Sequence, residues 1–301
     1  MTDTHTPRLQ ITWTGTDGSL WDLLGGPVRA STAGIRGLSM PEVEYAVQEY
    51  ALLHGQETTS YTVRPRKAFL PLRFADHDPY SVTQVQRNFW RSIRPGKTGT
   101  LTVSDGMGGA RSLLLKFGDD GMIAYKIDPN IITKAFGLSM TADAPFWTGP
   151  VRTTRWLDLG RGPRNFHGEN AGDPPLYIES SFARGDTETI RNDGDEDAWP
   201  VWRITSRLEG EPVTAYELTI GGAIISGATD IPAGHTLTIN TDPRAQTATL
   251  NGPLYSGDRT VEILEIGFAR IPAGEATTAT VALTGSGSVE LDTTELFYRA
   301  F

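Results

Sequence analysis

Short stretches in which apolar and polar residues alternate recur along most of the chain. Residues 9–13 alternate in this way, and a turn at 15–18 leads to the segment Leu20-Trp21-Asp22-Leu23, which predicts a hairpin. Residues 98–103 and 111–117 flank a glycine-rich turn and predict a second hairpin. A period of two residues is typical of strands with one buried face, so we expect a mainly β fold.

A longer hairpin is predicted over residues 40–74. Extended runs at 40–50 and 61–74 flank the polar segment 54–59, which we expect to form the tip. Pro65 and Pro71 interrupt the second run and favour an edge position or a bulge, because proline cannot donate to a strand ladder.

One helix is predicted, at residues 79–94. Apolar residues recur there at the spacing of a single helical face: Val82, Val85, Phe89, Trp90 and Ile93. Asp78 or Ser81 can cap its start, and the Pro95-Gly96 pair ends it.

The second half of the chain has regular short strands separated by turns, which predicts a β-sandwich. The same tetrapeptide, Ile-Pro-Ala-Gly, occurs at 231–234 and 271–274, each time before a threonine-rich strand. We interpret the two copies as shared turn chemistry rather than as a true repeat, because proline and glycine suit fixed positions of a β-turn.

A domain boundary is predicted at residues 143–150, where two prolines, a glycine and two large aromatics stand together. Residues 1–150 carry 15 Lys and Arg against 14 Asp and Glu, a net charge of +1; residues 151–301 carry 12 Arg against 22 Asp and Glu, a net charge of −10, and together they give −9. We therefore expect two domains. Residues 1–150 form a β-sandwich or barrel-like domain with one helix, and residues 151–301 form a β-sandwich.

Composition excludes several classes of function. The chain has no cysteine, which removes disulfides, thiolate metal sites and a cysteine nucleophile. It has no basic stripe for nucleic acid, no apolar run long enough to span a membrane, and no signal-peptide pattern. We expect a soluble protein made in the cytoplasm, without a nucleic-acid or membrane partner.

No group of residues predicts catalysis, a cofactor or a metal. The segment Asp193–Asp197 alternates carboxylates like the start of a calcium loop, but Ala198 and Ile204 stand where that loop needs glycine and a bidentate glutamate. We interpret it as a solvated acidic turn, with weak calcium binding as the alternative. A pair of glycosidase carboxylates among the acidic residues of the second domain would not be visible from spacing. We expect no enzymatic activity.

Aromatic residues of the second domain leave one binding alternative open. Large rings in a sandwich pack in the core or stack on sugars, and we favour the core. In the alternative, a carbohydrate-binding protein that adheres to the host, the stacking residues are Trp156, Tyr177 and Tyr255.

Several segments, taken in order, resemble the distal tail (Dit) proteins of long, flexible-tailed phages, in particular phages of actinobacteria. In the first half these are 53–56, 61–66, 70–74, the helix end Phe89-Trp90, 99–103 and 142–147; in the second half they are 190–195, 199–205, 231–234 and 237–242. The resemblance therefore covers nearly the whole chain. None of these segments is a catalytic signature.

This resemblance implies a structural protein at the virion tail tip, assembled in the host cytoplasm. In such proteins, the N-terminal domains of six copies form a homohexameric ring, and the ring joins the tail tube protein to the baseplate hub and its receptor-binding components. The second domain would be a galectin-like sandwich directed outward. The hairpin at 40–74 can pair its edges with neighbouring copies, and the subunit-interface residues we expect there are Tyr45, Val47, Tyr50, Tyr61, Val63, Arg64 and Arg66.

Overall fold

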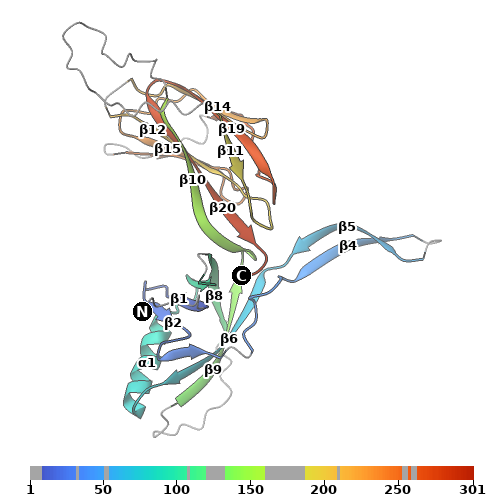
Figure 1. Cartoon of the computed structure of the whole chain (residues 1–301), viewed down its shortest axis with the longest axis vertical. Helices are drawn as coiled ribbons and strands as arrows, with labels where there is room; N and C mark the ends of the chain where they lie inside the picture. The colour runs from blue at the N-terminus through green and yellow to red at the C-terminus, as the bar shows by residue number, and fades with distance from the viewer. Residues whose placement is uncertain are drawn as a thin grey trace, which may run out of the picture. The chain divides into compact units, whose positions relative to one another are not determined.

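The structure, a computed structural model, consists of two compact units. It describes residues 9–31, 34–50, 54–106, 109–119, 133–159, 187–208, 211–252, 257–258 and 263–301. Unit 1 comprises residues 1–150 together with Leu296–Phe301, and unit 2 comprises Val151–Glu295 (Figure 1). The division after Pro150 falls where the composition changes. The six residues Leu296–Phe301, which the sequence placed in the second domain, belong instead to unit 1.

Antiparallel strands form the body of unit 1, which confirms the expectation of a mainly β fold. Their order is β2-β1-β7-β8-β9-β6-β3. Both predicted hairpins are present, as β1–β2 and β7–β8. The strands are β1 (Gln10–Thr14), β2 (Leu20–Asp22), β3 (Val28–Ala30), β6 (Arg66–Ala75), β7 (Thr98–Ser104), β8 (Ala110–Asp119) and β9 (Thr133–Ala142).

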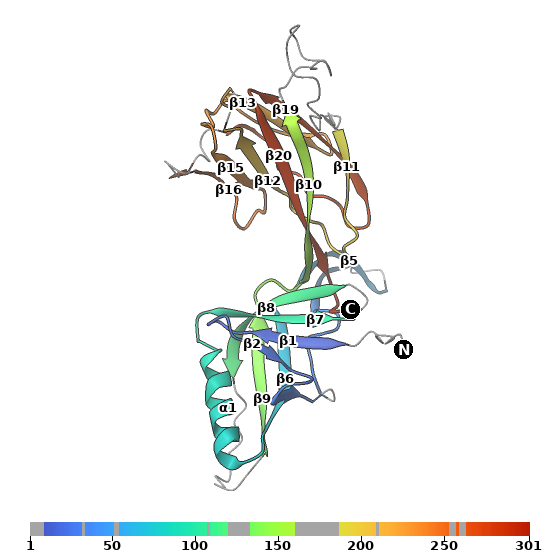
Figure 2. The same ribbon diagram turned by 60° about the vertical axis from the view of Figure 1, so that its left-hand side comes forward.

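One helix, α1 (Pro79–Arg91), packs beside β6, β3 and β9 (Figure 2). It buries Val82 and Phe89 in the same apolar core as Trp13 of β1 and Phe74 of β6, so both halves of the sheet and the helix share one interior. The N-cap is Asp78 rather than Ser81, and the helix ends at Arg91, three residues before the predicted end.

The strands β4 (Val43–Glu49) and β5 (Gln56–Val63) form a separate two-stranded sheet that projects from the body of unit 1 (Figure 1). We call this ribbon the arm. The predicted hairpin of residues 40–74 is thus too long: its second run divides at residues 64–65, and Arg66–Ala75 turns back into the main sheet as β6.

Unit 2 is a sandwich of two antiparallel sheets. One sheet has the order β17-β16-β15-β12-β20-β10, and the other has the order β11-β19-β13-β14-β18. Both contribute to one core, with Trp202 and Leu291 from the first sheet and Leu218 and Val281 from the second. The strands are β10 (Trp147–Leu159), β11 (Thr187–Arg191), β12 (Val201–Ser206), β13 (Ala215–Ile220), β14 (Ala223–Gly227), β15 (Thr236–Asn240), β16 (Thr247–Asn251), β17 (Gly257–Asp258), β18 (Ile263–Ile266), β19 (Ala276–Thr284) and β20 (Gly287–Phe297).

Residues 121–128 and 175–183, two further segments whose pattern predicts strands, lie outside the described residues. In the part of the chain that is described, no helix is both long enough and apolar enough to span a membrane.

Candidate functional site

The arm carries most of the residues predicted at a subunit interface. Val43 pairs with Val63 and Tyr45 pairs with Tyr61 across its two strands. Directly opposite residues share a face of a ribbon, and so do alternate residues of one strand, so these four residues lie on one face. The strand register shifts between Ala46 and Val47, and beyond this bulge Val47 stands opposite Thr58. This apolar face consists of Val43, Tyr45, Tyr61 and Val63, and the exposed Val47 follows it on β4 beyond the bulge.

Little of the chain covers this apolar face. Tyr45 is 61% exposed, Tyr61 57% and Val47 44%. Tyrosine buries a large ring at small entropic cost and is enriched in protein interfaces. A solvent-exposed ladder of two tyrosines and valines is therefore the kind of surface that a protein partner covers.

The opposite face of the arm is polar. Glu44 pairs with Thr62 in the strand register, and its carboxylate forms an ion pair with Arg64. Nearer the tip, the Tyr50 hydroxyl donates to Glu57 Oε2 at 2.9 Å. The arm is thus amphipathic near its root, where two valines and two tyrosines share one face and Glu44 and Thr62 lie on the other.

Both strands of the arm also have a free edge. Within the described residues, β4 and β5 pair only with each other. An unpaired edge presents backbone N–H and C=O groups that can bind another chain, so the arm offers both an apolar face and hydrogen-bonding edges.

Arg66 differs from the other predicted interface residues because its side chain is buried, at 2% exposure. Its Nε donates to Pro145 O at 2.6 Å and its Nη2 donates to Tyr298 O at 2.8 Å. Its Nη1 donates to Gly37 O at 2.8 Å and to Ser39 O. The guanidinium therefore lies inside unit 1 and does not offer a surface to a neighbouring copy.

The strand pattern contained a signal for this burial. Arg66, Ala68, Leu70, Leu72 and Phe74 alternate along β6 and all face the core. An arginine that shares one strand face with four buried apolar residues is expected to be buried too, and it then needs polar partners in the interior. Burial lowers the pKa of Arg66 to about 10, so the group is still charged at neutral pH.

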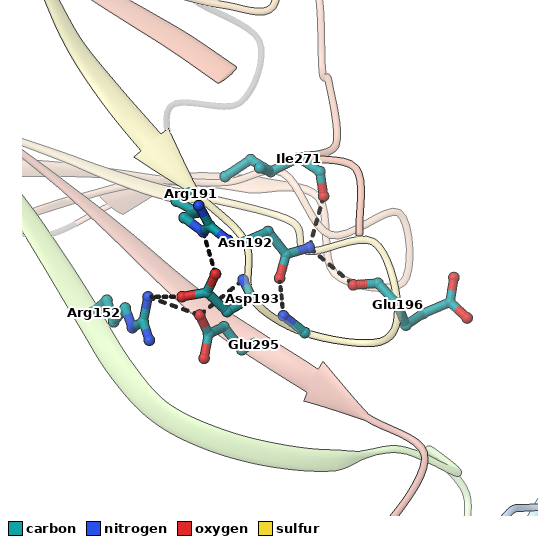
Figure 3. Close-up of polar contacts among 8 residues, drawn as sticks. Arg152, Arg191, Asn192, Asp193, Glu196, Ile271 and Glu295 are labelled. Carbon is teal, nitrogen blue, oxygen red and sulfur yellow. Dashed lines mark hydrogen bonds and ion pairs between the residues drawn. The ribbon is translucent and has the colours of Figure 1, made fainter. Parts of the chain in front are cut away.

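The acidic segment 193–197 is held by arginines and backbone groups (Figure 3). Asp193 accepts from Arg152 Nη1 at 2.9 Å and from Arg191, and Arg152 also binds Glu295 at 2.9 Å. Hydrogen bonds from Arg191 and then Arg152 lower the pKa of Asp193. Its carboxylate is already neutralised by two guanidinium groups.

Four further contacts fix the rest of this loop. Asp197 pairs with Arg270 at 2.7 Å and accepts from Ala273 N at 3.1 Å. The buried Asn192 amide donates to Ile271 O and Glu196 O, both at 2.9 Å (Figure 3). Among the described residues, no group of three or more His, Asp or Glu side chains is arranged to hold a metal ion. The geometry fits a structural turn.

Trp156 lies in the core of unit 2, fully buried and stacked on Trp202 with ring centroids 5.9 Å apart. Its ring is therefore not accessible to a sugar in this structure. Tyr177 and Tyr255, the other two residues of the predicted sugar platform, lie outside the described residues.

Comparison with solved structures identifies chains of the same fold. A chain of the phage P2 baseplate in its activated conformation with calcium superposes with a TM-score of 0.61 at 15% identity, over 96% of this chain and 98% of that one. The Dit protein of phage SPP1, described as a paradigm of the hub adsorption apparatus in phages that infect Gram-positive bacteria, gives 0.60 at 14% identity, over 95% and 98%.

The P2 baseplate with strontium gives a TM-score of 0.59 at 15% identity, over 96% and 98%. No protein-family model matches the sequence, and neither does any curated protein sequence. The chain thus has, over nearly its full length, the fold of a phage Dit protein, and this likeness is detected in the structure rather than in sequence comparison.

Proposed function

We propose that this chain is a Dit-type structural protein of a long, flexible phage tail. Six copies form a ring at the distal tip of the tail, through unit 1. The ring joins the tail tube protein on one side to the baseplate hub and receptor-binding components on the other. The protein acts by binding rather than by catalysis, and it assembles in the host cytoplasm.

The single observation that carries this proposal is the exposed apolar face of the arm on a fold that matches Dit and baseplate chains from end to end. An arm that binds the next copy makes a head-to-tail contact, and repetition of such a contact around an axis closes a ring. The residues of the arm that we assign to this contact are Tyr45, Val47, Tyr61 and Val63, together with Tyr50 and Arg64, which directly follow its two strands. Arg66 is not among them, because it is buried.

Light scattering on the purified chain tests the ring. One copy has a mass of 32.7 kDa, so six copies give 6 × 32.7, or about 196 kDa. We expect this mass at high protein concentration or on addition of tail tubes. A chain that remains a monomer under both conditions contradicts the proposal.

A pair of matched variants tests the role of the arm. Tyr45→Ser combined with Tyr61→Ser removes the two rings from the apolar face, and we expect it to abolish the assembly while the melting temperature of the monomer stays unchanged. Tyr80→Ser is the control, since Tyr80 is a 72% exposed tyrosine of unit 1 that lies outside the arm. If the double variant and the control have equal effects on the mass of the assembly, the arm does not form the subunit contact.

A further inference from the structure

The Arg66 guanidinium lies at the root of the arm. Arg66 stands three residues after the end of β5, and two of its acceptors, Gly37 O and Ser39 O, stand a few residues before the start of β4. One side chain therefore ties together the segments that enter and leave the arm. Its other two acceptors, Pro145 O and Tyr298 O, come from distant parts of the sequence.

The segment Leu296–Phe301, which we call the closing segment, supplies more than the Tyr298 carbonyl. Ala300 N donates to Leu38 O at 2.9 Å, between the two carbonyls that Arg66 binds. Arg111 Nη1 donates to Arg299 O at 2.9 Å, and the Arg111 guanidinium lies 3.7 Å above the Phe297 ring. The closing segment is thus built into unit 1 at the same place where the arm begins.

A buried guanidinium is stable only when its donors are satisfied. Removing one acceptor leaves a charged donor without a partner, which costs more than an ordinary hydrogen bond. In the described residues, no carboxylate forms an ion pair with Arg66. The hydrogen bonds to the four carbonyls therefore replace the water that the charged guanidinium loses on burial. Loss of the closing segment removes the partner of Nη2 and exposes the site to water.

We propose that Arg66 and the closing segment form a clasp that fixes the root of the arm, so that the arm becomes rigid enough for assembly only when the chain that follows unit 2 has returned to unit 1. The closing segment follows all 145 residues of Val151–Glu295 in the sequence. A nascent chain that ends within unit 2 therefore carries an arm whose root is not fixed. This inference rests on the proposed function for its consequence, ring assembly, but the clasp itself can be tested on the monomer.

The experiment compares two truncations of the full chain. One ends at Phe297 and removes Tyr298 and Ala300; the control ends at Ala300 and removes only Phe301, which is 62% exposed. Hydrogen exchange is measured by mass spectrometry on peptides that cover the arm root together with the two strands of the arm, residues 36–49 and 56–66. We expect exchange there to become about tenfold faster in the first truncation, because a hydrogen bond to a charged group is lost, and to stay unchanged in the control.

Arg66→Lys provides a second variant if the truncation fails to fold. Lysine keeps the charge but lacks the planar fork of donors that reaches four carbonyls. We expect faster exchange at the arm root, with peptides of unit 2, such as residues 201–206, unchanged. Unchanged exchange at the arm root in both variants overturns the clasp.

The mass of the assembly separates this inference from the proposed function. If the wild-type chain forms the ring and the variants form it equally well, the clasp does not govern assembly. If the wild-type chain forms no ring while the exchange at the arm root responds as expected, the proposed function fails and the clasp remains as a property of the monomer.

Discussion

At the residue scale, the two Ile-Pro-Ala-Gly segments adopt the same geometry. Ile231 N donates to Val213 O and Ile271 N donates to Ala198 O, both at 2.8 Å. The glycine at each end then donates to a residue at the end of a strand: Gly234 N to Ser206 O, the last residue of β12, and Gly274 N to Asn192 O, directly after β11, both at 3.0 Å. The two segments thus share one hydrogen-bonding pattern, the first before β15 and the second before β19, and each turn bond ends on the proline carbonyl: His235 N donates to Pro232 O and Glu275 N donates to Pro272 O.

Gly274→Ala is expected to destabilise unit 2 by about 1–2 kcal/mol, the cost of a left-handed backbone for a residue with a Cβ. Gly274 has a φ of +71°, and an added Cβ would meet no atom within 4 Å, so the cost is conformational rather than steric. Urea unfolding measures the difference. Gly274→Asn is the control, because asparagine tolerates this region better, and an equal loss in both variants would contradict the backbone explanation.

At the element scale, α1 is held at its start by Asp78. Its Oδ1 accepts from Tyr80 N at 2.9 Å and Ser81 N at 3.1 Å, and its Oδ2 accepts from Ser81 Oγ at 2.5 Å. The Ser81 hydroxyl first, and then the backbone amides, lower the pKa of Asp78 below its ordinary value of 3.8. The charged carboxylate is therefore the form that caps the helix.

Asp78→Ala should lower the melting temperature at neutral pH, and this difference should shrink in acid. A carboxyl group whose pKa is lower in the folded state stabilises fully above its unfolded pKa, and this contribution is lost as the pH falls through the folded pKa. Melting curves of both proteins at about pH 7 and about pH 3 test this. A difference that is the same at both pH values would show that the charge of Asp78 does not contribute.

Individual strands and the helix could be predicted from the sequence because their patterns are local. The hairpins β1–β2 and β7–β8 and the start of α1 each depend on neighbouring residues. The arm could not be delimited in this way: residues 61–63 and 66–74 are both extended, and only the pairing of β6 with β9 separates them. Pairing between strands distant in sequence is a tertiary property.

The same distinction between local pattern and tertiary contact explains which residues of the candidate site could be predicted from the sequence. The tyrosines of the arm could be found because alternation places them on one face. The position of Arg66 could have been found from its register with Leu70 and Leu72, but none of its acceptors could, because they lie 27, 29, 79 and 232 residues away in the sequence. Likewise, the aromatics of the second half did not reveal that Trp156 stacks on Trp202.

At the scale of the whole molecule, unit 1 is discontinuous and unit 2 is continuous. Residues 1–150 require Leu296–Phe301 to complete unit 1, whereas Val151–Glu295 contains both sheets and the whole core of unit 2. A cut between the units therefore has unequal consequences. It leaves unit 2 whole, but it takes the acceptor of Arg66 Nη2 and the buried residue Ala300 away from unit 1.

We expect a fragment of residues 151–295 to fold and to melt at the temperature of one of the transitions of the intact chain. A fragment of residues 1–150 should melt at a lower temperature than unit 1 does in the intact chain, because a buried charged donor loses its acceptor and apolar surface becomes exposed. Calorimetry on both fragments and on the intact chain makes the comparison. Joining residues 296–301 to the end of the shorter fragment through a flexible linker should restore the higher melting temperature. A fragment of residues 1–150 that is as stable as unit 1 in the intact chain would show that the returning segment contributes nothing to it.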